Sequence, residues 1–210
     1  MEINPETMPW NSLYKLMIGS VVPRPIGWIS TIDEQGQNNL APFSFFNVAS
    51  ANPPHVLFCP SIRGTDFGNK DTLNNVHQTQ EFVVNIVTED TAEAMNLTAT
   101  ELPPDVDEFA YAGLTAVASK LVKPARVRES PIQFECKLAQ IVNISDQPGG
   151  GSIVIGRVVH IHVDDAVLYD GDKIALETLK PVGRLAGFAY TRVTDVFDLV
   201  RRPSEVEPKK

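Results

Sequence analysis

The stretch PRPIGWISTIDEQGQNNLAPFSFFN, residues 23–47, decides the fold of this chain. Residues 26–32 are rich in apolar and β-branched types, which predicts a strand. The Asp-x-x-Gly turn at 33–36 separates this strand from a second strand-like segment, 39–47, so the two should form a β-hairpin. Pro42 has no N–H to donate to a sheet ladder, so the second arm belongs at a sheet edge or a bulge. Such an edge would offer an apolar shelf, with backbone amides free to contact a flat, partly polar ligand.

Size and composition limit the function. The 210 residues carry a formal net charge of −8, whereas a general nucleic-acid binder needs a basic face. One or two local cations would still suffice for a phosphate-bearing cofactor. We expect a single domain, residues 1–210. Cys59 and Cys136 show no metal-binding or disulfide pattern, and the sequence shows no signal region and no apolar run of membrane-spanning length. We therefore expect a cytoplasmic protein with no nucleic-acid or membrane partner.

The rest of the chain alternates predicted strands with a few short helices. Strands are predicted at 56–60, 81–87, 132–144 and 152–163. Helices are predicted at 11–17, with Ser12 as N-cap, at 70–77 and at 88–97. The proline-broken stretch 98–113 is long for a loop and is expected to be a lid or a dimer arm. Many strands with few helices predict a mainly β protein, a β-barrel with helical inserts.

Five segments together carry a resemblance to a known family. They read PRPIGWISTxDxxGxxNLAPFSFFN (23–47), NPP (52–54), KDTLNN (70–75), EFVVN (81–85) and IGRVVHIHVDD (155–165). In this order they resemble the flavin reductase-like family of FMN-binding split barrels, over residues 17–202. The resemblance implies a homodimer, a six-stranded Greek-key split β-barrel, and FMN at or near the subunit interface. Many such proteins reduce flavin with NADH or NADPH, and others hold FMN tightly and pass electrons on.

FMN needs donors for its phosphate, polar neighbours for its ribityl chain, and an apolar face with nearby donors for its ring. Lys70 beside Asp71 and Thr72 offers a cation at a helix start, which favours an anion, although a plain helix cap would use the same residues. By resemblance, the ring and ribityl contacts are Thr31, Asn39, Ala41, Pro42, Phe43 and Ser44. Asn47, Lys70, Asp71 and Thr72 are carried over in the same way, with Lys70 and Thr72 near the phosphate. Phe43 taken singly would fit the core equally well.

Three more residues complete the candidate cofactor-binding set, each with an open alternative. Ser30 can supply a hydroxyl or be an ordinary strand former. Arg24, between two prolines, can lie over the flavin or its phosphate, or be a surface charge. Tyr190, in a late glycine-rich loop with Arg184, can approach the flavin or contact a partner subunit.

Two further patterns bear on the chemistry. His160 and His162 share one face of a predicted strand and could bind a metal, but the sequence shows no third ligand. Gly151-Ser152 stands where some family reductases carry Gly-x-His near the nicotinamide, which departs from the standard pattern; His160 or His162 could substitute. The glycine run at 149–151 lacks the GxGxxG spacing, so NADH or NADPH would sit transiently on the exposed flavin face.

The leading interpretation is an FMN-dependent oxidoreductase, an NAD(P)H:flavin reductase that serves a small-molecule electron donor and acceptor. Hydride would pass from the nicotinamide to flavin N5, and no side chain would act as a nucleophile. The alternative is an FMN-containing electron-transfer protein without direct nicotinamide chemistry. A third hypothesis is a non-redox interaction protein with a split-barrel fold.

Overall fold

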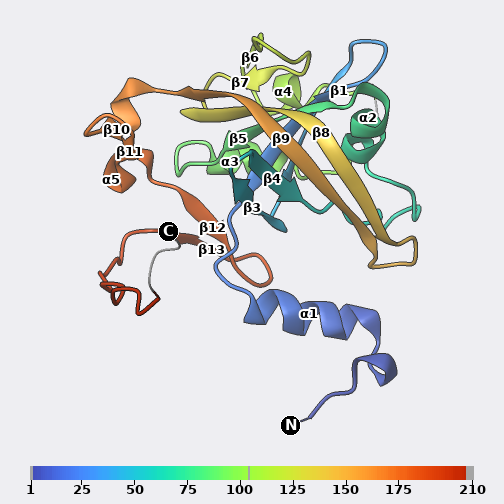
Figure 1. Ribbon diagram of the computed structural model, residues 1–210. Helices are drawn as coiled ribbons and strands as arrows, with labels where there is room; N and C mark the ends of the chain where they lie inside the picture. Colours follow the sequence, from blue (N-terminus) through green and yellow to red (C-terminus); the bar gives the residue numbers. More distant parts are fainter. Residues whose placement is uncertain (1, 104, 207–210) are drawn as a thin grey trace.

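The computed structural model describes residues 2–103 and 105–206 and is mainly β, with a few helices around one large sheet (Figure 1). In this part of the chain, seven antiparallel strands pair in the order β2-β1-β5-β8-β9-β4-β3. They are β1 Gly27–Ile32, β2 Asn38–Phe43, β3 Phe46–Ala51, β4 Pro54–Phe58, β5 Glu81–Ile86, β8 Ile132–Ser145 and β9 Gly151–Val163. Three short ladders are β6 Ala116–Val117 with β7 Arg126–Val127, β10 Leu168–Tyr169 with β11 Lys173–Ile174, and β12 Val182–Arg184 with β13 Tyr190–Arg192. The helices are α1 Trp10–Ser20, α2 Asp71–Thr79, α3 Ala92–Leu97, α4 Glu108–Tyr111 and α5 Leu176–Leu179, with 3-10 turns at Pro5–Thr7 and Asp165–Val167.

The predicted hairpin is confirmed as β1 and β2. The Asp33 carboxylate closes the turn by accepting bonds from the amides of Gln35 and Gln37, at 2.9 and 2.7 Å. β2 is an edge strand, as the proline predicted. The Leu40 amide points away from β1 and donates to a side chain outside the sheet. Pro42 lies two residues further along the same side, so its missing N–H costs no ladder bond.

The two edges of the sheet are consecutive in the chain. β2 ends at Phe43 and β3 begins at Phe46, yet these strands lie at opposite ends of the pairing order. Residues 44–45 turn between them, and the Phe45 carbonyl accepts from the Cys59 amide at 2.8 Å. The sheet in the described residues thus has seven strands where six were expected.

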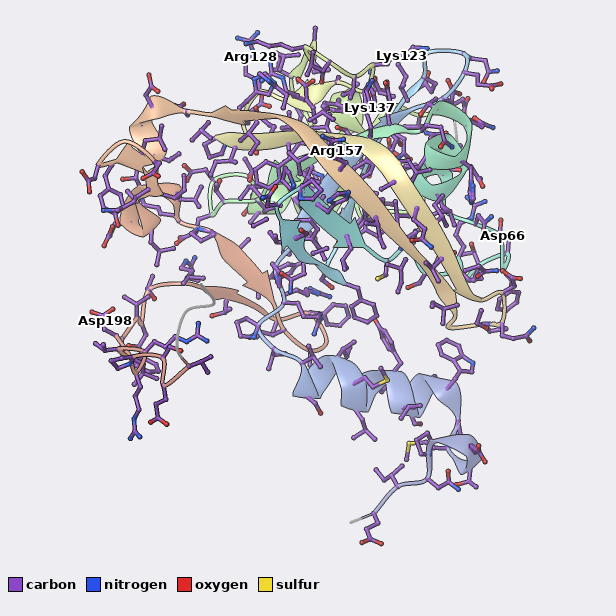
Figure 2. All side chains as sticks on the ribbon, viewed as in Figure 1. Asp66, Lys123, Arg128, Lys137, Arg157 and Asp198 are labelled. Atoms are coloured by element: carbon purple, nitrogen blue, oxygen red, sulfur yellow. The ribbon has the colours of Figure 1, made fainter. Side chains whose placement is uncertain are left out.

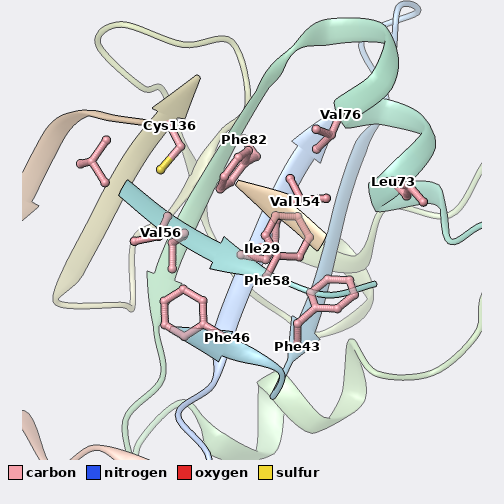
Figure 3. Packing of buried hydrophobic residues seen from close by; sticks show 12 residues of the cluster. Ile29, Phe43, Phe46, Val56, Phe58, Leu73, Val76, Phe82, Cys136 and Val154 are labelled. Carbon is pink, nitrogen blue, oxygen red and sulfur yellow. The ribbon is translucent and has the colours of Figure 1, made fainter. Parts of the chain in front are cut away.

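The main core lies between the curved sheet and α2. Phe58 stands between Phe43 and Phe82, with ring centroids 5.0 and 5.2 Å away. Figure 3 shows Leu73 and Val76 entering this cluster from α2. The two residues lie one turn apart on one face of the helix, as their spacing predicted. This packing fixes the start of α2 against β1 and β2.

A second cluster lies on the other face of the hairpin, around the fully buried Trp28 and Leu40. The Trp28 indole donates to the Thr98 hydroxyl at 2.9 Å and thereby fastens the chain just after α3. The stretch 98–113, expected to be a lid or a dimer arm, contains α4, whose Phe109 is buried in this cluster. Of the helix expected at 88–97, only Ala92–Leu97 is helical. The residues before it form a turn, in which the Thr88 amide donates to the Thr91 hydroxyl at 3.0 Å.

Two segments stand away from the sheet. α1 is set off beneath the sheet in Figure 1; its N-cap is Pro9 rather than the expected Ser12, and of its residues only Ile18 is buried. The chain after β13 forms no regular element as far as residue 206, and Figure 2 shows Asp198 there, apart from Lys137 and Arg157 on the long β8–β9 hairpin. Among the described helices, none has the length and apolar character needed to cross a bilayer.

Candidate functional site

The candidate site is a cleft along β2, which we call the β2 cleft. It consists of two adjoining cavities of about 80 and 150 Å³, and both are lined by Pro42 and Lys70. The first is lined also by Asn39, Ala41, Arg63, Asp71, Thr72, Thr98, Ala99, Thr100, Glu101, Leu102 and Glu108. The second is lined also by Tyr14, Phe43, Ser44, Phe45, Cys59 and Ser61. The structure therefore brings together eight of the residues expected to contact FMN: Asn39, Ala41, Pro42, Phe43, Ser44, Lys70, Asp71 and Thr72.

A small polar network attaches the start of α2 to the hairpin. The Asn39 side-chain amide donates to the hydroxyls of Thr31 and Thr72, at 3.2 and 2.9 Å. The Asn75 side-chain amide donates to the same Thr31 hydroxyl at 3.1 Å. Thr31 is fully buried and lies beneath the cleft lining. Thr31 therefore holds Asn39 in the cleft wall, and Asn39 in turn holds Thr72.

The start of α2 offers an anion site. Lys70 is the N-cap residue and partly buried, and no side chain of the described residues caps this nine-residue helix. The first amides of α2 consequently face the cleft with the positive end of the helix dipole. Lys70 takes part in none of the ion pairs found in the described part of the chain. A cation and unused amides beside the apolar Pro42 and Phe43 fit a planar ligand with a phosphate, such as FMN.

Carboxylates limit where that phosphate can lie. The first cavity has Asp71, Glu101 and Glu108 in its wall, against the cations Arg63 and Lys70. Arg63 is already paired, with Asp66 at 3.2 Å and with Asp71 at 3.4 Å. The second cavity has no carboxylate among its described lining residues. An anion is therefore best accommodated at Lys70, where the two cavities meet.

Glu108 is the most unusual of these acids. Its side chain reaches from α4 to the edge of the sheet and accepts the outward Leu40 amide at 3.0 Å. Burial raises the pKa of the Glu108 carboxyl group, and this effect outweighs the Leu40 amide, which lowers it. The carboxyl group thus accepts the outward-pointing Leu40 N–H, which lies two residues before Pro42 on the edge of β2.

Arg24 lies next to the cleft and is buried. Its guanidinium donates to the carbonyls of Ile18 and Val21 at the end of α1, at 2.6 and 2.9 Å, and to the Leu185 carbonyl at 3.0 Å. Its Nε donates to the Ser44 hydroxyl at 3.3 Å. Burial lowers the pKa of Arg24. The side chain therefore joins α1, the end of β2 and the loop after β12, and it is no surface charge.

Three expected cofactor contacts lie apart from the β2 cleft. The fully buried Ser30 hydroxyl donates to the Ala125 carbonyl at 2.5 Å. Asn47 is exposed on β3, where its side chain accepts the Val48 amide at 2.8 Å. Tyr190 lies on β13, with the Arg184 guanidinium 4.4 Å from its ring centroid and its hydroxyl 3.2 Å from the Asn96 side-chain oxygen.

The two histidines belong to a separate cluster around Glu135. The His162 ring is 2.6 Å from the Glu135 carboxylate and its centroid is 4.6 Å from that of His160. Glu135 is fully buried and also accepts the amides of Lys120 and Leu121, at 2.7 and 2.6 Å. Burial alone would raise the pKa of Glu135, but these amides and His162 together lower it. Among the described residues, no group of three His, Cys, Asp or Glu side chains is placed to hold a metal ion.

Sequence reasoning missed several residues of the cleft. Arg63 had a local signal, because it is a second cation in the same loop as Lys70. Tyr14, Cys59 and Glu108 had none, because each comes from an element that meets β2 only in the folded protein.

Comparison with known proteins now places the chain. Residues 18–175 match the flavin reductase like domain. The chain belongs to the flavin reductase-like family. Nitrilotriacetate monooxygenase component B from Bacillus cereus is 36% identical with a TM-score of 0.89, over 95% of this chain and 98% of that protein. The 2-nitrobenzoate 2-nitroreductase NbaA of Pseudomonas fluorescens is 29% identical with a TM-score of 0.85, over 99% of each chain. A Shewanella frigidimarina protein with a split barrel domain shares the fold, at 23% identity and a TM-score of 0.81, over 96% of this chain and 100% of that one.

Proposed function

We propose that this protein is an FMN-dependent oxidoreductase that takes electrons from NADH or NADPH and delivers them to a small-molecule acceptor. The observation that carries the proposal is the β2 cleft, in which Lys70 at the start of α2 adjoins the apolar Pro42 and Phe43. Family membership supports flavin as the ligand. The related nitroreductase, 29% identical over nearly the whole chain, supports a redox role.

Each part of the cleft has a distinct task in this proposal. When bound, FMN supplies the hydride acceptor and the electron relay. Lys70 and the first amides of α2 bind the phosphate. Asn39, which is held by Thr31, and Thr72, which is held by Asn39, orient the polar chain of the cofactor. Pro42 and Phe43 provide an apolar surface against the ring and keep water from it.

We also propose that the protein is a cytoplasmic homodimer of single-domain, Greek-key subunits. Large apolar side chains on the two segments that stand off the sheet support the dimer. Met17 on α1 is 54% exposed, and Phe197 and Val200 after β13 are 81% and 95% exposed. Burying such residues against a second copy would remove a large apolar area from water. Asn47 and Tyr190, which lie outside the cleft of their own chain, would reach the FMN of the second subunit.

An anaerobic titration tests this function. The purified protein is loaded with FMN, and its absorbance is followed as NADH or NADPH is added without oxygen. Bleaching of the flavin bands by the nicotinamide is the expected result. Bleaching by dithionite alone would mean an electron carrier instead. A protein that binds no FMN at micromolar concentration would contradict the proposal altogether.

A further inference from the structure

We propose that Tyr14 of α1 is a positioning residue for FMN: it forms the wall of the ring site that β2 does not supply. This inference rests on the proposed function and extends it to a helix that contributed no residue to the expected site. Tyr14 lines the second cavity together with Pro42, Phe43, Ser44 and Lys70. Among the described lining residues, it is the one aromatic side chain that comes from outside the sheet and its connecting turn, and it is 47% exposed.

α1 is fixed at both ends, so Tyr14 cannot drift freely. At the C-terminal end, the Arg24 guanidinium holds the carbonyls of Ile18 and Val21. The same side chain donates to Ser44, which also lines the second cavity. Arg24 thereby sets the distance between the helix and the cleft.

At the N-terminal end, Trp10 lies on the turn of the β8–β9 hairpin. Gly149 has a φ of +82° and faces the indole so closely that a Cβ there would overlap the ring. Only glycine combines this backbone conformation with room for the indole. Trp10 is therefore seated against the sheet even though α1 stands off it.

The spacing along α1 aligns these contacts. Trp10, Tyr14 and Ile18 are four residues apart and share one helix face. The first contacts the hairpin turn, the last is buried, and Tyr14 lies midway, over the cavity. Leu16 lies on another face and is 44% exposed, outside both cavities. The helix face that meets the cleft thus carries two aromatic residues, Trp10 and Tyr14, whereas Leu16 points elsewhere.

A planar flavin ring gains from a second apolar surface. Aromatic side chains bind planar heteroaromatic rings by stacking, which is worth roughly tenfold or more in affinity per ring. A tyrosine also keeps its hydroxyl in water while its ring is covered. On its Pro42 and Phe43 side the second cavity is apolar, which suits the ring, while Lys70 at its border with the first cavity suits the phosphate.

The test compares Tyr14→Ala, Tyr14→Phe and the matched control Leu16→Ala. Two quantities are measured for each: the Kd for FMN and the emission of the bound flavin, which the electron-rich ring of a stacked tyrosine quenches. Tyr14→Ala should raise Kd about tenfold and make the bound flavin brighter. Tyr14→Phe should keep the wild-type Kd but make the bound flavin brighter, because a phenyl ring is a poor electron donor to the excited flavin. Leu16→Ala should match the wild type in both.

The outcomes separate this inference from the proposed function. If the wild type binds FMN and Tyr14→Ala leaves Kd and emission unchanged, Tyr14 has no contact with the ring and only this inference fails. If Leu16→Ala weakens binding as much as Tyr14→Ala, the effect belongs to the helix and the inference also fails. If the wild type binds no FMN, both proposals fail together.

Discussion

The β2 cleft and the Glu135 cluster are both groups of charged and polar side chains beside strand ends, but they differ in how their hydrogen-bonding groups are used. Around Glu135, every strong donor meets the carboxylate: two amides and one imidazole, all within 2.7 Å. At the start of α2, the Lys70 ammonium and the first helical amides have no such partner among the described residues. A cluster whose donors all have acceptors within the protein stabilises the fold, whereas a ligand site leaves donors without a protein acceptor, so that they can bind the ligand.

The largest effect is expected from removing the Glu135 carboxylate, which tests whether its cluster serves stability rather than ligand binding. Glu135→Ala leaves a cavity at a fully buried position and removes the acceptor of the partly buried amides of Lys120 and Leu121, so the free energy of unfolding should fall by about 3 kcal/mol. Urea unfolding at pH 7 measures this. Glu135→Gln keeps one acceptor and should lose less. FMN affinity of the folded protein should stay within twofold of wild type, and a large change would show that the two sites are not independent.

For Lys70 we expect the opposite: a large effect on FMN affinity and a small one on stability. Lys70→Ala should raise the Kd for FMN about tenfold or more, because a charge-assisted contact to phosphate is lost, while the unfolding free energy changes by less than about 0.5 kcal/mol. The loss should shrink at high salt. Lys137→Ala is the matched control, since Lys137 lies on β8 as an exposed cation 3.9 Å from Glu81. Equal effects of the two substitutions would mean that Lys70 acts only through net charge.

How much of this was predictable follows from the range of each interaction. The β1–β2 hairpin, the edge position of Pro42 and a helix beginning near residue 70 are local, and the sequence predicted them, although the N-cap is Lys70 and neither Asp71 nor Thr72. Ser30 looked like a ligand contact, but its hydroxyl is used by the Ala125 carbonyl, 95 residues away. Nothing in a strand pattern shows which distant segment will cover it. The same holds in reverse for Tyr14 and Glu108, which reach the cleft from α1 and α4.

The pH dependence of stability should differ in sign between Glu135, which is buried, and Glu108, which is partly buried. The pKa of Glu135 is lowered, so its contribution is present above its unfolded pKa of about 4.3 and is lost as the pH falls through its folded value. The pKa of Glu108 is raised, so stability falls as the pH rises from the unfolded to the folded value. At neutral pH, Glu135→Gln should be less stable than the wild type and Glu108→Gln more stable. Both differences in unfolding free energy should shrink as the pH falls. Urea unfolding of the three proteins between pH 3.5 and roughly 7.5 checks both slopes.

The smallest expected effect concerns the cleft itself. Glu108→Gln keeps an acceptor for the Leu40 amide and removes one negative charge from the first cavity. A phosphate bound at Lys70 would then experience less repulsion, so the Kd for FMN should fall by about twofold to fivefold at low salt and by less at high salt. Riboflavin, which has no phosphate, is the control ligand and should bind both proteins equally. If riboflavin gained as much as FMN, Glu108 would act on the ring or the ribityl chain, and the anion would have to be placed elsewhere than at the start of α2.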